Sequence, residues 1–184
     1  MRFIFLLVLV PLLSACGVSV GDLGEYWDKG AIDSSLTGKW KLEGGPEDVV
    51  EFTRKGIDYH IIEYSKDKPP RTSPGNVRVL YVNAHTFLMM RSDEGDHNSL
   101  VRYDIKGDKL ITYLPNENMR ESFVKRYPDS GINVIDSGNL QPQHGDRYSV
   151  EIPELTPEVV SLIGKLADDP RYWVHFPPPL TRQK

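Results

Sequence analysis

The stretch VVEFTRKGIDYHIIEY, residues 49–64, decides the fold class of this chain. Apolar and polar residues alternate in both halves, through Val50 and Phe52 in the first half and through Tyr59 and Ile61 in the second. Alternation with a period of two is typical of β-strands that bury one face. The glycine between the halves supplies the positive φ that a tight hairpin requires. The stretch therefore predicts two antiparallel strands joined by a short turn.

Similar short runs, rich in β-branched and aromatic residues, recur on both sides of this hairpin. Turn residues separate them, among them a second Gly-containing connection at Gly107. Seven strands are expected, at 36–42, 48–54, 57–64, 77–82, 86–91, 99–105 and 109–114. This order predicts an antiparallel meander.

Two helices are expected after Pro115, where the alternation stops. The apolar residues of 119–127 lie four apart on one helical face, and a proline follows them. The second helix, at about 156–168, begins with Thr156 as N-cap and Pro157 in the first helical position. A further strand is expected at 131–136. The fold class is thus mainly β or α+β: a small barrel or curved sheet with one or two packed helices.

The segment Leu36-Thr37-Gly38-Lys39-Trp40 resembles the Gly-x-Trp opening of lipocalin-like barrels. The resemblance implies that Trp40 closes one end of the barrel, that Gly38 has a structural role, and that a helix packs outside the strands. The length of the chain predicts a single β-rich domain over residues 36–184. A half-open sheet is the alternative architecture.

The first 15 residues have the layout of a secretory signal peptide. Arg2 precedes an apolar run of about 11 residues, Phe3 to Leu13, and the small residues Ser14 and Ala15 follow. A helix that crosses the hydrocarbon layer needs roughly 20 residues. This segment is therefore expected to be removed rather than to stay as an anchor.

Leu13-Ser14-Ala15-Cys16 resembles the lipobox of bacterial lipoproteins, and Cys16 is the only cysteine of the chain. The resemblance implies cleavage before Cys16 and acylation with palmitate or similar chains. Gly17 follows where an aspartate would retain the protein in the inner membrane, so the outer membrane facing the periplasm is expected. Residues 16–35 are small, polar and turn-rich, and they predict a tether in which Trp27 packs against little.

The charge of the exported chain is negative. Of the 22 Lys and Arg residues one leaves with the signal peptide, and 26 Asp and Glu residues remain, which gives a net charge of −5. This argues against nucleic acid and anionic lipid surfaces as partners. With its only cysteine lipidated, the chain has no disulfide.

No segment predicts catalysis, a metal site or a cofactor. Gly17-Val18-Ser19-Val20-Gly21 has the letters of a nucleophile elbow, but a tether cannot hold Ser19 against a histidine. The loop 92–98 is rich in oxygen ligands, yet its spacing does not match a calcium loop. The five histidines show no metal-ligand spacing. They are His60, His85, His97, His144 and His175.

Two functions remain open. Tyr59, Tyr81 and Tyr103 fall on predicted strands, where phenol groups suit a cavity for a small apolar or amphipathic ligand. The first hypothesis is therefore a ligand-binding module. The second is an interaction, inhibitor or structural lipoprotein that contacts another envelope protein through an exposed loop or sheet face. An interior cavity favours the first, and a filled interior favours the second.

Overall fold

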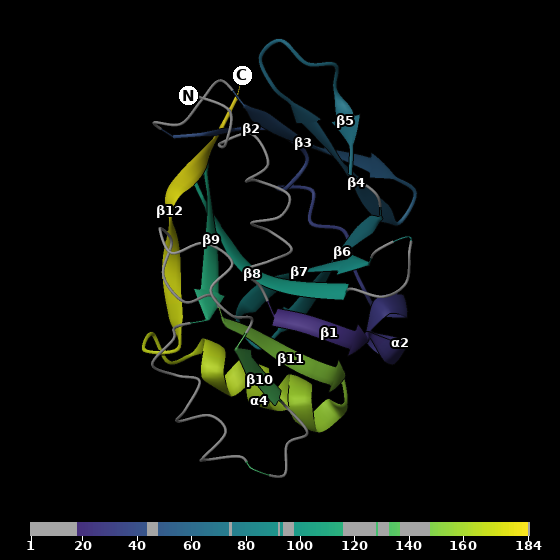
Figure 1. The fold of residues 1–184 in the computed structure, drawn as a ribbon, viewed down its shortest axis with the longest axis vertical. Coiled ribbons are helices and arrows are strands. Elements are labelled where there is room, and N and C mark those ends of the chain that lie inside the picture. The colour runs from purple at the N-terminus through teal and green to yellow at the C-terminus, as the bar shows by residue number, and fades with distance from the viewer. Residues whose placement is uncertain are drawn as a thin grey trace.

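The computed structural model describes residues 18–43, 48–73, 75–91, 93, 98–115, 128, 133–136 and 148–183, with the backbone alone at 133–136, 148–149, 174 and 176–178. Figure 1 shows a β-barrel whose sheet extends on one side, where a helix packs against it. Cys16 and the helix predicted at 119–127 lie outside the described residues.

Eight antiparallel strands close the barrel. The seven predicted strands are all present and pair in chain order, and a later strand, β12, lies between β9 and β2. In chain order the strands are β2 (Gly38–Leu42), β3 (Val49–Lys55), β4 (Asp58–Tyr64), β6 (Asn76–Val82), β7 (His85–Arg91), β8 (Asn98–Lys106), β9 (Lys109–Pro115) and β12 (Trp173–Arg182). The short strand β5 (Arg71–Thr72) pairs only with β4. The closed barrel confirms the predicted meander and excludes the half-open sheet.

The quoted hairpin forms as its alternation predicts. Val50, Phe52, Tyr59 and Ile61 belong to one buried cluster and are each at most 4 % exposed. Gly56 has a φ of 67° in the turn between β3 and β4, a conformation that an L-residue adopts only at a cost. Hydrophobic burial on one face thus fixes the register of this strand pair.

The sheet continues beyond the barrel because β8 changes its neighbour. Near its start it pairs with β1 (Val18–Asp22), with Leu100 opposite Val18, and from Arg102 onward it pairs with β9. On its other edge β1 lies parallel to β11 (Tyr148–Glu154), which pairs with β10 (Asn133–Asp136). The strand predicted at 131–136 is therefore confirmed as β10.

The helix predicted at 156–168 is present as α4 (Pro157–Ala167). The Thr156 Oγ1 accepts a hydrogen bond of 3.3 Å from the Val159 N–H, as the capping pattern predicts. Buried side chains of α4 share a second hydrophobic cluster with Leu80 and Phe87, which lie on the outer face of β6 and β7. The sheet of β6, β7 and β8 therefore separates two cores, one inside the barrel and one under α4.

The prediction that residues 16–35 form a tether is wrong for the part that the structure describes, residues 18–35. β1 and the short helix α2 (Gly24–Asp28) belong to the folded domain, and Ala31 forms a bridge with Val79. Trp27, expected to pack against little, is only 7 % exposed. The physical reason is that β1 pairs with residues far away in the sequence. β8 and β11 provide hydrogen-bond partners for the backbone on both edges of β1, and local composition does not reveal such pairing.

Candidate functional site

The predicted tyrosines gather at one end of the barrel, around Asp33. The Tyr59 hydroxyl donates a hydrogen bond of 2.6 Å to the Asp33 backbone carbonyl, and the Tyr103 hydroxyl donates one of 2.8 Å to Asp33 Oδ2. The Ser35 N–H also donates to Asp33 Oδ1, at 2.9 Å. Burial raises the pKa of Tyr103, and the adjacent Asp33 carboxylate raises it further. The two hydroxyls thus hold the segment around Asp33 across the end of the barrel.

Tyr81 lies at the rim of the same end, and its side chain is 55 % exposed. Its pKa is raised by partial burial and by the neighbouring Asp33 and Tyr59. Sequence reasoning placed Tyr81 on the wall of an interior ligand cavity together with Tyr59 and Tyr103. The structure brings the three residues to one end but leaves Tyr81 facing solvent.

The barrel interior is packed at the residues that the structure describes. Its largest side chains have almost no accessible surface: Trp40 and Tyr59 are 0 % exposed, Tyr103 is 1 % and Phe52 is 2 %. A cavity wide enough for a ligand, or even for water, would leave accessible surface on the side chains that line it. An eight-stranded barrel is narrow enough for side chains to fill it completely. Tyr59 and Tyr103 are therefore core residues with satisfied hydroxyls.

Trp40 lies at the same end of the barrel as Asp33. Its indole N–H donates a hydrogen bond of 2.8 Å to the Leu36 carbonyl, which fixes the segment that leads into β2. Gly38, the other residue of the Gly-x-Trp motif, has a φ of 122°. The cation over the Trp40 ring is Arg182, with its guanidinium carbon 4.2 Å from the ring centre.

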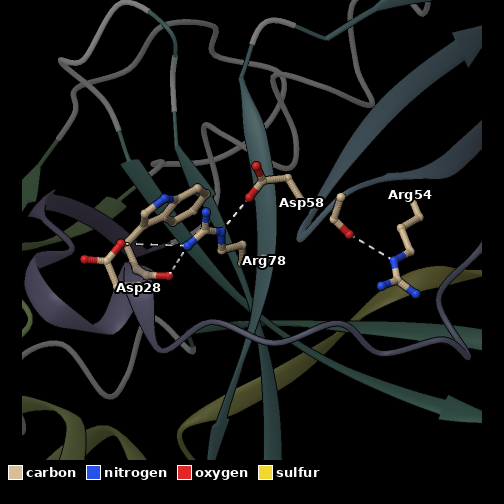
Figure 2. Close-up of polar contacts among 6 residues, drawn as sticks. Asp28, Arg54, Asp58 and Arg78 are labelled. Atoms are coloured by element: carbon tan, nitrogen blue, oxygen red, sulfur yellow. Dashed lines mark hydrogen bonds and ion pairs between the residues drawn. The ribbon is translucent and has the colours of Figure 1, made fainter.

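Arg78 is the centre of a second charged group, and Figure 2 shows its contacts with Asp28 and Asp58. Arg78 is 8 % exposed; its Nε donates to Asp58 Oδ1 at 2.5 Å, and its Nη1 donates to the Trp27 carbonyl at 2.7 Å. Its guanidinium carbon is 4.5 Å from the centre of the Trp27 ring, and Asp28 lies 3.9 Å from Nη1. The charge of Arg78 is thus paired with carboxylates, and its N–H donors hold Trp27 and Asp58 in place.

A third charged group is centred on Arg102, where the pairing of β8 with β9 ends. Unlike Arg78, Arg102 has no carboxylate partner among the described residues. The Arg102 guanidinium carbon is 4.5 Å from the centre of the Tyr113 ring and 6.0 Å from that of the Trp173 ring. Its Nη1 donates a hydrogen bond of 2.9 Å to the Ala167 carbonyl at the end of α4. We refer to Arg102, Tyr113 and Trp173 as the Arg102 cluster. The exposed His175 lies against Tyr113, with the ring centres 6.2 Å apart.

Two N–H groups of the Arg102 cluster lack an acceptor. Arg102 Nε and Trp173 Nε1 are buried and have no hydrogen-bond partner. An unpaired buried donor costs about 1–3 kcal/mol, so most folded proteins avoid it. Within the described ranges no carboxylate forms an ion pair with Arg102 either. The fold therefore leaves two buried donors of this cluster unpaired.

Sequence reasoning missed the Arg102 cluster, although one signal was available. Arg102 follows Leu100 on the same face of a strand, and Leu100 is fully buried. An arginine that continues an apolar strand face requires a partner for its charge. Trp173 gave no comparable signal, because its contact with Arg102 joins strands about 70 positions apart in the sequence.

The described residues bring no catalytic or metal-binding set together. Ser19, the serine of the elbow-like motif, lies in β1 between two strands. Within the described part of the chain no group of three or more His, Cys, Asp or Glu side chains is placed to hold a metal ion. His85 bonds Asp168 at 2.8 Å, between β7 and the end of α4. Most of the loop 92–98 lies outside the described residues.

Comparison of the chain with protein-family models, with curated proteins and with solved structures gave no match. Among the described residues, no helix has the length and apolar character to span a membrane.

Proposed function

We propose that this chain is a lipoprotein of the bacterial envelope, anchored through lipid on Cys16 in the outer membrane and facing the periplasm. Its barrel serves as a rigid scaffold that binds another envelope protein through its outer surface. The lipobox-like segment and the position of the only cysteine support the anchor. The packed interior of the barrel supports the choice of the outer surface.

The packed interior carries the functional part of the proposal. Trp40, Tyr59 and Tyr103 fill the space that a lipocalin-like barrel would use for a ligand. A small apolar ligand would have to displace these side chains and break the hydrogen bonds to Asp33. Truncation of a buried aromatic side chain typically costs about 3–5 kcal/mol, which indicates how strongly such packing resists displacement. Binding inside the barrel is therefore the less favoured alternative.

Two exposed side chains of the barrel offer apolar surface for a protein partner. Ile57, in the turn between β3 and β4, is 59 % exposed, and Tyr81 at the end of β6 is 55 % exposed. They are the large hydrophobic side chains exposed in the described part of the chain. Aromatic and aliphatic side chains of this kind often anchor protein interfaces.

The anchor is tested by labelling cells with a palmitate analogue. Cys16→Ala is expected to abolish the label and to leave the protein unprocessed or soluble, because both thioether formation and cleavage depend on this sulfur. Ser19→Ala is the matched control, three residues further along, and is expected to take up label like the unchanged protein. Continued labelling of Cys16→Ala in the membrane fraction would contradict lipidation.

The outer-surface function is tested by placing a photo-reactive amino acid at Ile57 or at Tyr81 in cells. Both positions are expected to give an adduct of the same discrete mass with one envelope protein. The exposed Lys165 on α4 is the control position and should give no such adduct. Native mass spectrometry of the purified protein tests the alternative: a stoichiometric small apolar molecule lost on Tyr103→Trp would favour the ligand-binding module.

A further inference from the structure

The first strand of the fold begins beside the end of β9, on one edge of β8. The β8–β9 pairing runs from Lys106 to Arg102, and the β8–β1 pairing begins at Leu100, opposite Val18. Since β7 occupies the other edge of β8, both partners lie on the same edge. β9 therefore ends where β1 begins, as Figure 1 shows. We refer to the start of β1 and the end of β9 as the anchor junction.

Chain length ties the proposed lipid to the anchor junction. Only Gly17 separates Cys16 from Val18. A residue spans at most about 3.6 Å, so the Cα of Cys16 is within about 7 Å of the Cα of Val18 in any conformation. Val18 is 5 % exposed, and β1 pairs with β8 and β11, so these residues cannot act as a spacer. A flexible tether of about 20 residues would instead have a root-mean-square reach of about 22–27 Å.

The order of strands places β3 on the opposite wall of the barrel from β8. From β8 the wall runs through β7, β6 and β4 to β3 in one direction, and through β9, β12 and β2 to β3 in the other. β3 is thus the fourth strand from β8 both ways. The turn that follows β3 contains Ile57, which is 59 % exposed. This exposed side chain therefore lies on the wall across the barrel from the anchor junction.

We propose that the lipid on Cys16 holds the domain directly against the membrane in one orientation, with the anchor junction toward the lipid headgroups and the β3–β4 turn toward the aqueous compartment. This inference rests on the proposed lipidation of Cys16. The surface that carries the anchor is the occupant, because the short link keeps it, and no other partner, permanently beside the anchor junction.

The contact with lipid needs no charge attraction. The exported chain has a net charge of −5 and is not drawn to an anionic surface. The covalent link supplies the local concentration that a free protein would need electrostatics to reach.

The orientation also restricts the protein partner of the Ile57 surface. A domain without a spacer cannot move far from its membrane, so the partner has to lie on that membrane or project from it. Because Ile57 is on the wall across from the anchor junction, the partner approaches from the aqueous side.

The test measures which wall of the barrel contacts lipid. The Cys16 sulfur is a thioether in the lipidated protein, so one introduced cysteine is the only free thiol and can carry a fluorophore. His175→Cys marks the anchor side, because His175 is exposed and pairs with Tyr113 near the end of β9. Ile57→Cys marks the opposite wall. The labelled protein is reconstituted into phosphatidylethanolamine–phosphatidylcholine vesicles, with or without a phospholipid that carries a quenching nitroxide on its headgroup.

Quenching by the nitroxide is expected to be several-fold stronger for the label at 175 than for the label at 57. Arg171→Cys and Lys55→Cys, both at exposed residues, are second positions on the anchor side and on the opposite wall. They keep the comparison valid if a first variant melts at a lower temperature in detergent than the unlabelled protein.

A longer link provides the matched control. Insertion of about 20 Gly and Ser residues between Gly17 and Val18 keeps the anchor and the fold but restores the reach of a flexible tether. This variant is expected to show weak and similar quenching at both labels.

The outcomes separate orientation from anchoring. Equal quenching at 57 and 175 with the natural link, or stronger quenching at 57, would overturn the proposed orientation while the anchor still stood. A difference that the inserted linker left unchanged would also overturn the proposal, because the short link would then not orient the domain. Failure of the protein to float with the vesicles would instead count against lipidation.

Discussion

The guanidinium group of Arg182 in β12 stacks on the indole ring of Trp40 in β2, with 4.2 Å between the guanidinium carbon and the ring centre. The same guanidinium donates a hydrogen bond of 2.7 Å to the Thr37 carbonyl and another to the Ser35 carbonyl. One side chain of the last strand therefore holds the first strand of the barrel and the segment that plugs it. The same side chain, Arg182, therefore stabilises both the closure of the barrel wall and the segment that covers its end.

Trp40→Ala is expected to lower the free energy of unfolding by about 3–5 kcal/mol, because it removes a fully buried ring. This is a large share of the total of about 5–15 kcal/mol for a typical domain. Trp40→Phe retains a ring for Arg182 but leaves the Leu36 carbonyl without its donor, and it should cost about 1–3 kcal/mol. Thermal and urea melts of the two variants measure which of them loses more stability. A loss below about 1 kcal/mol for Trp40→Ala would contradict the role of this residue in closing the barrel.

Trp27→Ala is also expected to be strongly destabilising, by about 3–5 kcal/mol, in contrast to the small effect expected for a tether residue. Trp27 is 7 % exposed, and the Arg78 guanidinium lies over its ring. Ile57→Ala, at a side chain that is 59 % exposed, is the control and should change stability by at most about 0.5 kcal/mol. Similar small shifts in both melts would restore the interpretation of residues 18–35 as a tether.

The raised pKa of Tyr103 predicts a loss of stability at alkaline pH. Burial and the Asp33 carboxylate raise the pKa of its phenol well above 10, so the folded protein keeps the proton that the unfolded chain loses near pH 10. The unfolded state then binds fewer protons, and the free energy of unfolding falls as the pH rises above 10. One such group contributes about 1.4 kcal/mol per pH unit. Urea titrations on either side of pH 10 should give a shallower decline for Tyr103→Phe, and an equal decline would exclude this linkage.

The sequence was most informative where local pattern and tertiary structure agree. In β3 and β4 burial alternates over the first four residues of each strand, and α4 has its N-cap, its Pro157 and an apolar stripe in one short segment. In these elements neighbouring residues carry the information that packing uses. The bounds of the predicted strands and of this helix therefore lie within a few residues of those in the structure.

Among the strands that were not predicted, β1 and β12 are decided by distant residues. β1 offers only Val18 and Val20 as apolar residues, and its partners lie about 80 and 130 positions away. β12 contains three consecutive prolines, which lack the N–H that a central strand needs. The structure accommodates them in a register shift between Phe176 and Leu180, while the flanking residues pair with β9. The local propensity of the three prolines therefore disfavours β12, although the barrel needs this strand to close.

The Arg102 cluster and the Asp33 plug were missed for a related reason. Each joins side chains from segments far apart in the sequence, and each depends on a polar residue at a half-buried position. The tyrosines were found as candidates, but their partner was not, because Asp33 belonged to the supposed tether. Placement of residues 18–35 in the fold thus changes the interpretation of the tyrosines from ligand contacts to core residues.

The elbow-like motif gives the last prediction, through Ser19 and Gly21. Ser19 lies in β1 opposite Ser99 on β8 and Glu151 on β11, so Ser19→Ala should leave stability within about 0.5 kcal/mol of the original value. A Cβ at Gly21 would lie 2.5 Å from the Pro153 carbonyl oxygen, closer than real contacts allow. The obstacle is backbone, so β1 and β11 would have to separate for Gly21→Ala to fit.

Gly21→Ala is therefore expected to cost at least about 1–3 kcal/mol, as for other overpacked sites, although alanine loses less conformational entropy than glycine on folding. Urea melts of the two variants side by side measure the contrast. The glycine is then explained by strand packing and needs no catalytic role. Two results would reverse this conclusion: a hydrolase activity that Ser19→Ala abolishes, or a Gly21→Ala variant as stable as the unchanged protein, which would mean that β1 and β11 are not packed as closely as described.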